Sequence, residues 1–161
     1  MLNLKKRANE DGFTLVEIMV VILIIAILIA IAIPVFLGSR LSALDRATQS
    51  NLRNSMTVGK IIYTDNGDYS TITVAELGEL EPSMDFQSAA SSGGKEISFD
   101  RVSDTVVVYA ALSDSEECWY LRDRVGNSAI TTGTQFSSRG QGVAGACQAS
   151  NTVGLAWADG W

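Results

Sequence analysis

The most constraining feature of this chain is a long apolar segment near its N-terminus. All twenty residues from 18 to 37 are apolar, and the nearest charged residues on either side are Glu17 and Arg40. A helix of that length, at a rise of ~1.5 Å per residue, spans the ~30 Å hydrocarbon core of a bilayer. A helix that is apolar on every side would need a far larger protein than 161 residues to bury it. The segment therefore predicts a membrane-spanning helix.

A cleaved secretory signal peptide is the alternative interpretation of this segment. The basic cluster at residues 5–7 and the Ala-Ile-Ala pattern at residues 30–32 fit such a peptide. However, the apolar run continues past that pattern, and Pro34 lies two residues beyond the cut. We therefore expect a retained single span, with the N-terminus in the cytoplasm and the chain after Arg40 outside, because basic residues flank the cytoplasmic end of such helices.

Composition argues against an enzyme and against a general nucleic-acid-binding protein. The chain has no histidine, which removes histidine-based acid–base catalysis and the commonest metal ligand. The glycines of residues 140–145 lack the Gly-Lys-Ser/Thr ending of a phosphate-binding loop. Because the formal net charge is −6, nucleic acid would bind only through a local patch of Arg122, Arg124 and Arg139, for which a solvated strand face is the default interpretation. We expect no enzymatic activity and no cofactor.

The residues that precede the apolar segment resemble the N-terminus of a type IV pilin precursor. A short basic leader ends in Gly12, and the sequence FTLVE then runs from Phe13 to Glu17. The resemblance implies that prepilin peptidase cuts between Gly12 and Phe13 and that Phe13 is then N-methylated. It also implies that Glu17 pairs with the N-terminal amine of a neighbouring subunit, and that the helix kinks or locally unwinds at Pro34. The twelve-residue leader and the N-terminal Phe look most like the type IVa branch.

The physical chemistry of Glu17 is consistent with this resemblance. A charged carboxylate deep in a bilayer costs about 2.5–3.5 kcal/mol, so such groups usually mark function and seek a partner. Cleavage after Gly12 would create an α-amino group that is cationic near neutral pH. The alternative is a glutamate that rests at the headgroup boundary, which its position also permits.

The pattern after the apolar segment predicts that the helix continues and becomes amphipathic. We expect one helix over residues 13–63, in which residues 13–38 form the transmembrane or filament-core part and residues 39–63 the amphipathic part. Pro34 and Gly38 are the expected places for bending. The predicted buried stripe comprises Leu41, Leu44, Thr48, Leu52, Met56, Gly59 and Tyr63.

A turn cluster at residues 64–68 is predicted to end this helix. The segment YTDNGDYS around it resembles the loop that follows the long helix in many pilins. Asp65, Asn66 and Asp68 are weak candidates for calcium ligands, but their spacing does not match an EF-hand loop, so we expect a plain turn and no metal.

The remaining chain predicts a small α+β domain. A capping-box pattern at residues 73–76 opens a short helix that extends through Leu80. Alternating apolar residues bounded by turns predict antiparallel strands. These strands lie at residues 97–102, 105–112 and 118–125, with a fourth near 130–136. The resemblance thus implies the type IV pilin fold, in which a long N-terminal helix packs on an antiparallel sheet of three to four strands. Residues 1–12 would be the leader and residues 64–161 the extracytoplasmic globular domain.

Cysteine and tryptophan residues make the last set of predictions. Cys118 and Cys147 fit a single disulfide, and the resemblance implies that this bridge staples a C-terminal loop; the alternative is two buried free thiols. Trp119 is expected in the core, whereas Trp157 and Trp161 would dock the C-terminal tail onto the sheet or contact neighbouring subunits.

The function that the resemblance implies is that of a structural subunit of a type IV pilus. Its partners would be further copies of itself, prepilin peptidase, the pilus assembly machinery and the cytoplasmic membrane before assembly. Adhesion, twitching motility, DNA uptake and secretion share this architecture. The alternatives are a type II secretion pseudopilin or minor pilin, and a membrane-anchored extracellular binding module. The chain lacks the Pro-Trp-Gly stretch of the major pseudopilins.

Overall fold

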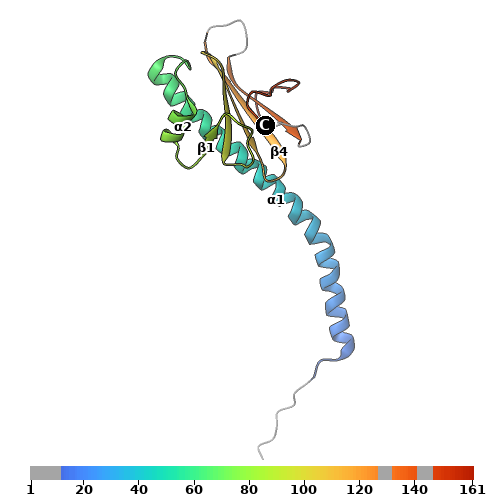
Figure 1. Cartoon of the computed structure of the whole chain (residues 1–161). Coiled ribbons are helices and arrows are strands. Elements are labelled where there is room, and N and C mark those ends of the chain that lie inside the picture. Colours follow the sequence, from blue (N-terminus) through green and yellow to red (C-terminus); the bar gives the residue numbers. More distant parts are fainter. Residues whose placement is uncertain (1–11, 127–131, 141–146) are drawn as a thin grey trace, which may run out of the picture. The chain divides into compact units, whose positions relative to one another are not determined.

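A computed structural model describes residues 12–126, 132–140 and 147–161 of the chain. Two helices precede all five strands of a single sheet in the sequence, and the predicted α+β class is confirmed (Figure 1). The elements are α1 (Leu15–Asn66), α2 (Val74–Leu80), β1 (Asp85–Gln87), β2 (Glu96–Ser103), β3 (Val106–Leu112), β4 (Glu117–Arg124) and β5 (Gly133–Gly140). The chain divides into two compact units, Met1–Ser39 and Arg40–Trp161.

The first unit contains the apolar part of α1. Thr14 is the N-cap of this helix, because its hydroxyl accepts a hydrogen bond from the Glu17 amide at 3.1 Å. The helix is continuous through Pro34, which has no N–H to donate to the preceding turn. Among the described helices, α1 is long and apolar enough to cross a membrane, with no residue of its most apolar window buried.

The second half of α1 packs on the sheet through a face that differs in part from the predicted stripe. Leu41 is exposed, and Ser55, Val58 and Ile62 are buried instead. Ser55 can be buried because its hydroxyl donates to the carbonyl of Asn51 at 2.9 Å, which leaves no polar hydrogen unpaired. The buried residues of α1 are Thr48, Leu52, Ser55, Val58, Gly59 and Ile62.

The end of α1 corrects the predicted turn at residues 64–68. The helix extends to Asn66, so Thr64 and Asp65 belong to its last turn. Gly67 terminates it with a φ of 84°, a left-handed conformation that glycine adopts without steric cost. The Gly67 amide donates to the carbonyl of Tyr63 at 2.8 Å, which satisfies one of the free carbonyls at the helix end.

Helix α2 begins where the capping-box pattern predicts. The side chain of its N-cap, Thr73, accepts a hydrogen bond from the Glu76 amide at 3.2 Å. Leu77 is buried on the side of α2 that faces the core, and Glu79 and Leu80 are exposed. The short helix therefore packs through a single buried leucine and presents acidic side chains to solvent.

The sheet has one more strand than the upper end of the predicted range. Its order is β1-β2-β3-β4-β5, and all neighbours are antiparallel except β1, which runs parallel to β2. β1 contains three residues, of which Phe86 is buried, and this is too short for an alternation pattern to register. The fourth predicted strand is β5, which starts later, at Gly133, and continues through polar residues to Gly140. Residues 130 and 131 of the predicted range lie outside the described part of the chain.

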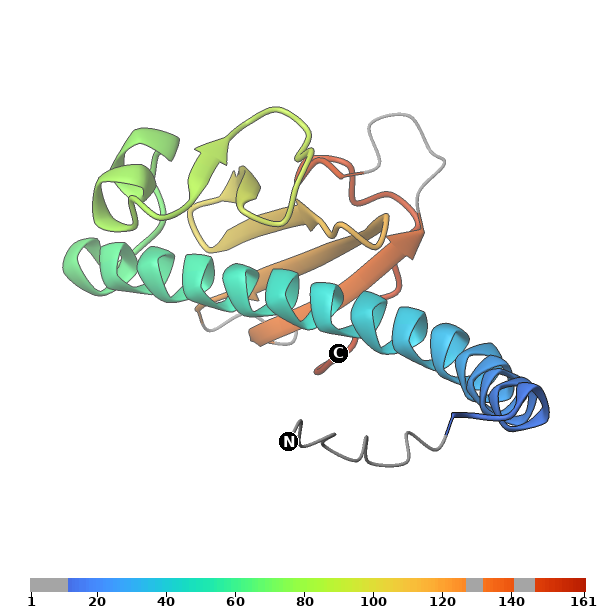
Figure 2. The same ribbon diagram turned by 90° about the horizontal axis from the view of Figure 1, so that it is seen from below.

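Each face of the sheet is covered by a different segment. Figure 2 shows α1 lying along one face, which we call the inner face. Alternation along β4 sends Leu121 into the cluster that contains α1 residues, and Tyr120 into a second cluster that contains residues of the C-terminal tail. We call the latter side the outer face. The buried tyrosines are Tyr69, Tyr109 and Tyr120.

Close contact between α1 and β3 depends on a glycine. A Cβ built at Gly59 would lie 2.1 Å from the hydroxyl of Tyr109, which is closer than any real contact. The absence of a side chain at Gly59 thus lets the fully buried Tyr109 ring fit under the helix.

Candidate functional site

The first candidate site is the N-terminal end of α1, where the expected processing residues lie. Gly12 and Phe13 precede the helix in non-helical conformation, and Phe13 is 76% exposed. No heavy atom lies within 4 Å of a Cβ built at Gly12. Both residues of the peptide bond between Gly12 and Phe13 are therefore exposed and lie outside the helix.

Glu17 lies in the first turn of α1, three residues after the cap. Its side chain is exposed, and its amide bonds the hydroxyl of Thr14, so Thr14 and Glu17 occupy the N-cap and N3 positions of a capping box. A carboxylate in the first turn interacts favourably with the unpaired N–H groups and the positive end of the helix dipole. The same carboxylate lies four residues after Phe13 in the chain.

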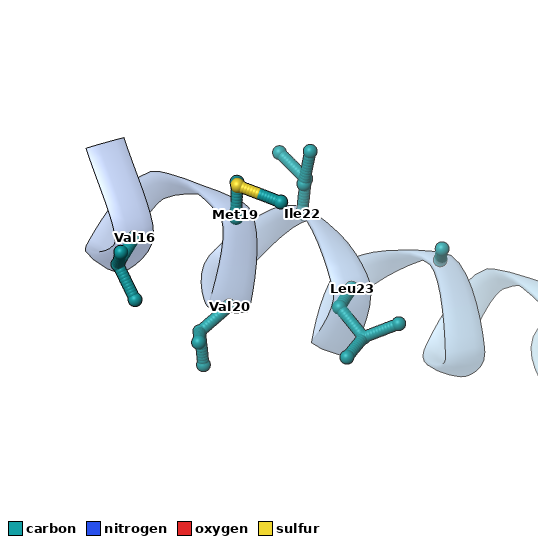
Figure 3. Close-up of a pocket in the computed structure, with 6 residues that line it drawn as sticks. Val16, Met19, Val20, Ile22 and Leu23 are labelled. Atoms are coloured by element: carbon teal, nitrogen blue, oxygen red, sulfur yellow. The ribbon is translucent and has the colours of Figure 1, made fainter.

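The apolar side chains around Glu17 form an uncovered surface (Figure 3). A shallow groove on this part of α1 is lined by Val16, Met19, Val20, Ile22, Leu23 and Ala26. The large apolar side chains of residues 15–37 are roughly half or more exposed; Ile18 is 48% and Phe36 68% exposed. Such a continuous apolar surface marks contact with lipid or with other apolar helices.

The weak metal candidates are used in local turn structure. Asn66 donates from its amide nitrogen to the hydroxyl of Thr71 at 2.9 Å. Asp68 accepts the amide of Ser70 at 2.8 Å, and hydrogen bonds from Ser70 lower the pKa of the Asp68 carboxyl. Within the described residues, no three His, Cys, Asp or Glu side chains are grouped as metal ligands.

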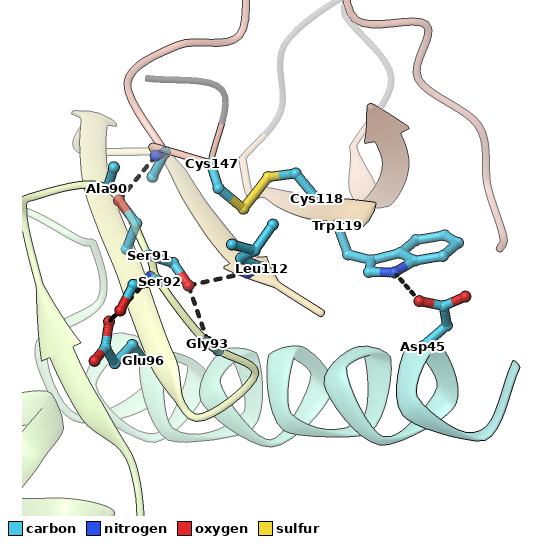
Figure 4. The surroundings of a disulfide bond; sticks show 12 residues. Asp45, Ala90, Ser91, Ser92, Gly93, Glu96, Leu112, Cys118, Trp119 and Cys147 are labelled. Atoms are coloured by element: carbon cyan, nitrogen blue, oxygen red, sulfur yellow. Dashed lines mark hydrogen bonds between the residues drawn. A yellow bond between two sulfur atoms is a disulfide. The ribbon is translucent and has the colours of Figure 1, made fainter. Parts of the chain in front are cut away.

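Cys118 and Cys147 form a disulfide that joins β4 to the C-terminal tail (Figure 4). Both residues are buried, and 29 positions separate them in sequence. Ser91 supports the bridge: its amide donates to the carbonyl of Cys147 at 2.8 Å, and its hydroxyl accepts the amide of Leu112 at 2.9 Å. The disulfide therefore fixes the start of the tail over the outer face of the sheet.

The C-terminal tail passes from the outer face of the sheet to the inner face around β5. Trp157 packs in the outer cluster, and Ala158 pairs with Phe136 at the free edge of β5. Trp161 then packs on the inner side, edge-to-face against Trp119 at 5.0 Å between ring centroids. Figure 4 shows the Trp119 nitrogen directed at Asp45 of α1, with a hydrogen bond of 3.2 Å. The predicted docking of both tail tryptophans onto the sheet is confirmed.

A buried polar cluster around Asp123 was not predicted. Its side chain is fully buried, and Lys60 of α1 forms an ion pair with it at 3.1 Å. Tyr69 donates to it at 2.7 Å and Thr134 of β5 at 3.0 Å. Side chains alternate along β4, so Asp123 lies on the same inner face as Trp119 and Leu121. A charged residue at a position that alternation assigns to the core could have indicated this cluster from the sequence. The cluster ties α1, β4, β5 and the loop after α1 together.

The three arginines of the predicted basic patch share the outer face but differ in their partners. Arg139 donates to the carbonyl of Val153 and lies 6.0 Å from the ring of Tyr120, so it is engaged by the tail. Arg122 lies over the ring of Trp157 at 4.0 Å. Burial, and secondarily the charge of Arg124, lowers the pKa of the Arg122 guanidinium. The patch is therefore reduced to Arg122 and Arg124.

Comparison with known proteins adds one finding to this geometry. Residues 7–33 match the family model described as the prokaryotic N-terminal methylation motif. The chain has no match among the curated proteins or the solved structures with which it was compared. The matched range includes Gly12, Phe13, Glu17 and most of the apolar segment of α1. The chain therefore carries the prokaryotic N-terminal methylation motif, the signature of type IV pilin-like prepilins.

Proposed function

We propose that this protein is the structural subunit of a type IV pilus. The observation that carries the proposal is that an N-terminal methylation motif leads into an apolar helix whose side chains are uncovered over its whole membrane-length part. Such a surface needs a partner, which would be lipid before assembly and the same helix of other subunits afterwards. The globular unit of residues 40–161 would remain on the extracytoplasmic side and form the filament surface.

Processing would convert residues 1–12 into a removed leader. Prepilin peptidase would cut the accessible bond after Gly12, and Phe13 would become the N-methylated first residue. Because Thr14 caps α1 by itself, the helix would keep its first turn after cleavage. The new amine would then lie next to a preformed helix end.

Glu17 would select the axial position of each subunit in the filament. In an apolar helix bundle, its carboxylate is stabilised only by a positive charge or by hydrogen-bond donors. The N-terminal amine of an incoming subunit supplies that charge, so pairing would be favoured at the axial offset that brings the two groups together. The apolar surface in Figure 3 would then pack against neighbouring helices at the same offset.

The experiment that tests the proposal measures both processing and assembly in cells. Intact mass of the membrane or filament protein should match a chain that starts at Phe13 and carries one added methyl group. Glu17→Gln keeps the shape of the side chain and removes its charge, so processing should continue while surface filaments are lost. Glu10→Gln is the matched control, since it removes a charge from the leader and leaves the mature chain unchanged. A mature chain that starts after residue 32, or normal filament yield from Glu17→Gln, would show the proposal to be wrong.

The disulfide favours a pilin over a type II secretion pseudopilin, because major pseudopilins usually lack such a cysteine pair; it does not bear on the alternative of a minor pilin. Pilins, minor pilins and pseudopilins share the same processing, so the amount of this protein in surface filaments distinguishes them. A major pilus subunit should be the main component of filaments sheared from cells, as identified by mass. If the protein is processed but occurs in sheared filaments only as a trace component, it is a pseudopilin or minor pilin. A processed protein with no role in any filament is a membrane-anchored binding module.

A further inference from the structure

Charge is distributed unevenly over the globular unit. Residues 61–94 contain six acidic residues and no lysine or arginine. Four of the six lie close together in sequence on α2 and around β1: Glu76, Glu79, Glu81 and Asp85. Glu79 and Asp85 are exposed, and Glu76 and Glu81 are half-buried. We call this segment the acidic edge, because β1 is one edge strand of the sheet.

The opposite side of the same sheet carries two arginines. Arg122 and Arg124 lie on β4, next to the other edge strand β5, and both point to the outer face because they alternate with the inward Asp123. Figure 1 shows α2 and β1 on one side of the sheet and β4 toward the other. We call Arg122 and Arg124 the basic edge. Three strand positions separate it from β1 in the sheet order.

The arginines of the basic edge lack acidic partners. The ion pairs among the described residues join Lys60 to Asp123 and Arg101 to Asp104. The Nε atoms of both Arg122 and Arg124 are buried without a hydrogen-bond partner. Residues 127–131 and 141–146, outside the described part, contain no aspartate or glutamate. Because these Nε atoms are buried, a partner could reach only the terminal nitrogens of the two guanidinium groups. Two adjacent like charges without a counter-ion form a site that a carboxylate would stabilise.

The position of Arg122 is fixed before any partner binds. Its guanidinium lies over the ring of Trp157 at 4.0 Å and donates to the side-chain oxygen of Gln135 at 2.5 Å. These contacts hold the side chain against the outer face, which lowers the entropy cost of a further contact. A planar guanidinium held in this way accepts a carboxylate in a two-point arrangement.

We propose that the basic edge of one subunit binds the acidic edge of the next copy of this chain. The two edges lie on opposite sides of one sheet, so the contact is head-to-tail. A head-to-tail contact that does not close into a ring continues as an open helical filament. The inference rests on the proposed function as a filament subunit, and it names the contact that the globular units make in addition to the one made by their N-terminal helices.

The test reverses each edge and then exchanges them. Arg122→Glu/Arg124→Glu makes both edges acidic, and Glu76→Arg/Glu79→Arg makes both edges basic. Each variant should lower the yield of sheared filaments by about tenfold, because like charges placed across an interface repel. The chain with all four substitutions has exchanged edges that are again complementary, and its filament yield should return close to that of the unmodified chain.

The control variant separates this contact from a general effect of net charge. Lys95→Glu/Arg101→Glu makes the same change in charge at one residue just before β2 and one residue on it, and should leave filament yield near normal. Thermal melts of each purified full-length variant in detergent check that the globular unit still folds. The inference is wrong if the edge variants fold normally and also give a normal yield of filaments. It is also wrong if the filament yield of the four-substitution chain is no higher than that of either double variant.

Two further measurements make the outcome specific. Intact mass of every variant should match a methylated chain that starts at Phe13, since the edges lie far along the chain from the cleavage site. If the unmodified chain is not processed or forms no filaments, the proposed function is wrong. If the unmodified chain is processed and forms filaments, the variants test only the edge contact. If edge reversal spares filaments but abolishes binding of a fluorescent single-stranded oligonucleotide, the arginines bind phosphodiesters and the edge contact is excluded.

Discussion

The ion pair between Lys60 and Asp123 offers the sharpest test of how the globular unit is held together. Asp123 is fully buried, and Lys60 is 42% exposed, so substitution of the lysine leaves a carboxylate inside the protein without its counter-ion. Loss of one partner of a buried pair costs about 3–5 kcal/mol. We expect Lys60→Met to cost about 3 kcal/mol, at the low end of that range, because water can approach the carboxylate from the partly exposed side.

Replacement of the carboxylate should cost less than loss of the lysine. The hydroxyl of Tyr69 donates to a carboxylate oxygen of Asp123 at 2.7 Å. Asp123→Asn keeps an oxygen that can accept this hydrogen bond, but it removes the charge that strengthens the bond. We expect a loss of about 2 kcal/mol. The double variant Lys60→Met/Asp123→Asn contains no buried unpaired charge, so its cost should fall below the sum of the two single costs by about 2 kcal/mol.

The assay is unfolding of the full-length protein in a mild detergent, followed by tryptophan fluorescence. For a globular unit of this size, a loss of 3 kcal/mol corresponds to a melting temperature lower by about 10–15 °C. Arg101→Met is the matched control: the Arg101–Asp104 pair has the same 3.1 Å separation, but both side chains are largely exposed, at 41% and 66%. We expect it to cost at most about 0.5 kcal/mol. Equal effects of Lys60→Met and Arg101→Met, or additive costs in the double variant, would refute the reasoning.

Three other predictions follow from the packing of the globular unit. Cys118→Ser/Cys147→Ser should lower the free energy of unfolding by roughly 3.5 kcal/mol, as expected for a cross-link over 29 residues. The melting temperature of this variant should equal that of the reduced protein, and a value equal to that of the oxidised protein would contradict the prediction. Gly59→Ala should cost at least about 1–3 kcal/mol because its Cβ meets a tyrosine hydroxyl, whereas Gly78→Ala in α2, with open space around it, should stabilise by up to about 1 kcal/mol. Burial raises the pKa of all three buried tyrosines, so stability should be unchanged by these groups below about pH 10 and fall above it, where only the unfolded chain releases their protons. Absorbance at the tyrosinate band should therefore rise together with loss of circular dichroism, and an earlier, separate rise from three tyrosines would disprove the prediction.

Local patterns in the sequence were sufficient for much of the fold. The apolar run, the cap at Thr73 and the alternation in β2, β3 and β4 depend on neighbours within a few residues, and the structure has all of these elements. The end of α1 was predicted too early because Thr64 and Asp65 were read as part of the turn. The helix accepts both residues, and only Gly67 adopts the left-handed conformation that stops it.

Of the strands without a clear alternation, β1 was not predicted from local pattern and β5 was predicted only in part. β1 has only three residues and exists because β2 offers it a parallel partner, with Phe86 opposite Ile97. β5 is polar along most of its length and is held by its ladder to β4 and by the tail. In both strands, backbone pairing to a neighbour supplies the stability that buried side chains supply elsewhere.

The sequence alone determined that the N-terminal segment carries the methylation motif, because its information is local: a basic stretch, a Gly-Phe pair, a carboxylate and an apolar run follow one another in the chain. Only the tertiary structure decided what the charged and aromatic residues of the globular unit do. Tyr69 and Asp123 are 54 residues apart in sequence, and Asp45 and Trp119 are 74 apart. Contacts at such separations depend on which faces of the helix and sheet meet. The tertiary structure therefore decides that Asp123 is paired inside the protein, whereas Arg122 and Arg124 have no acidic partner among the described residues.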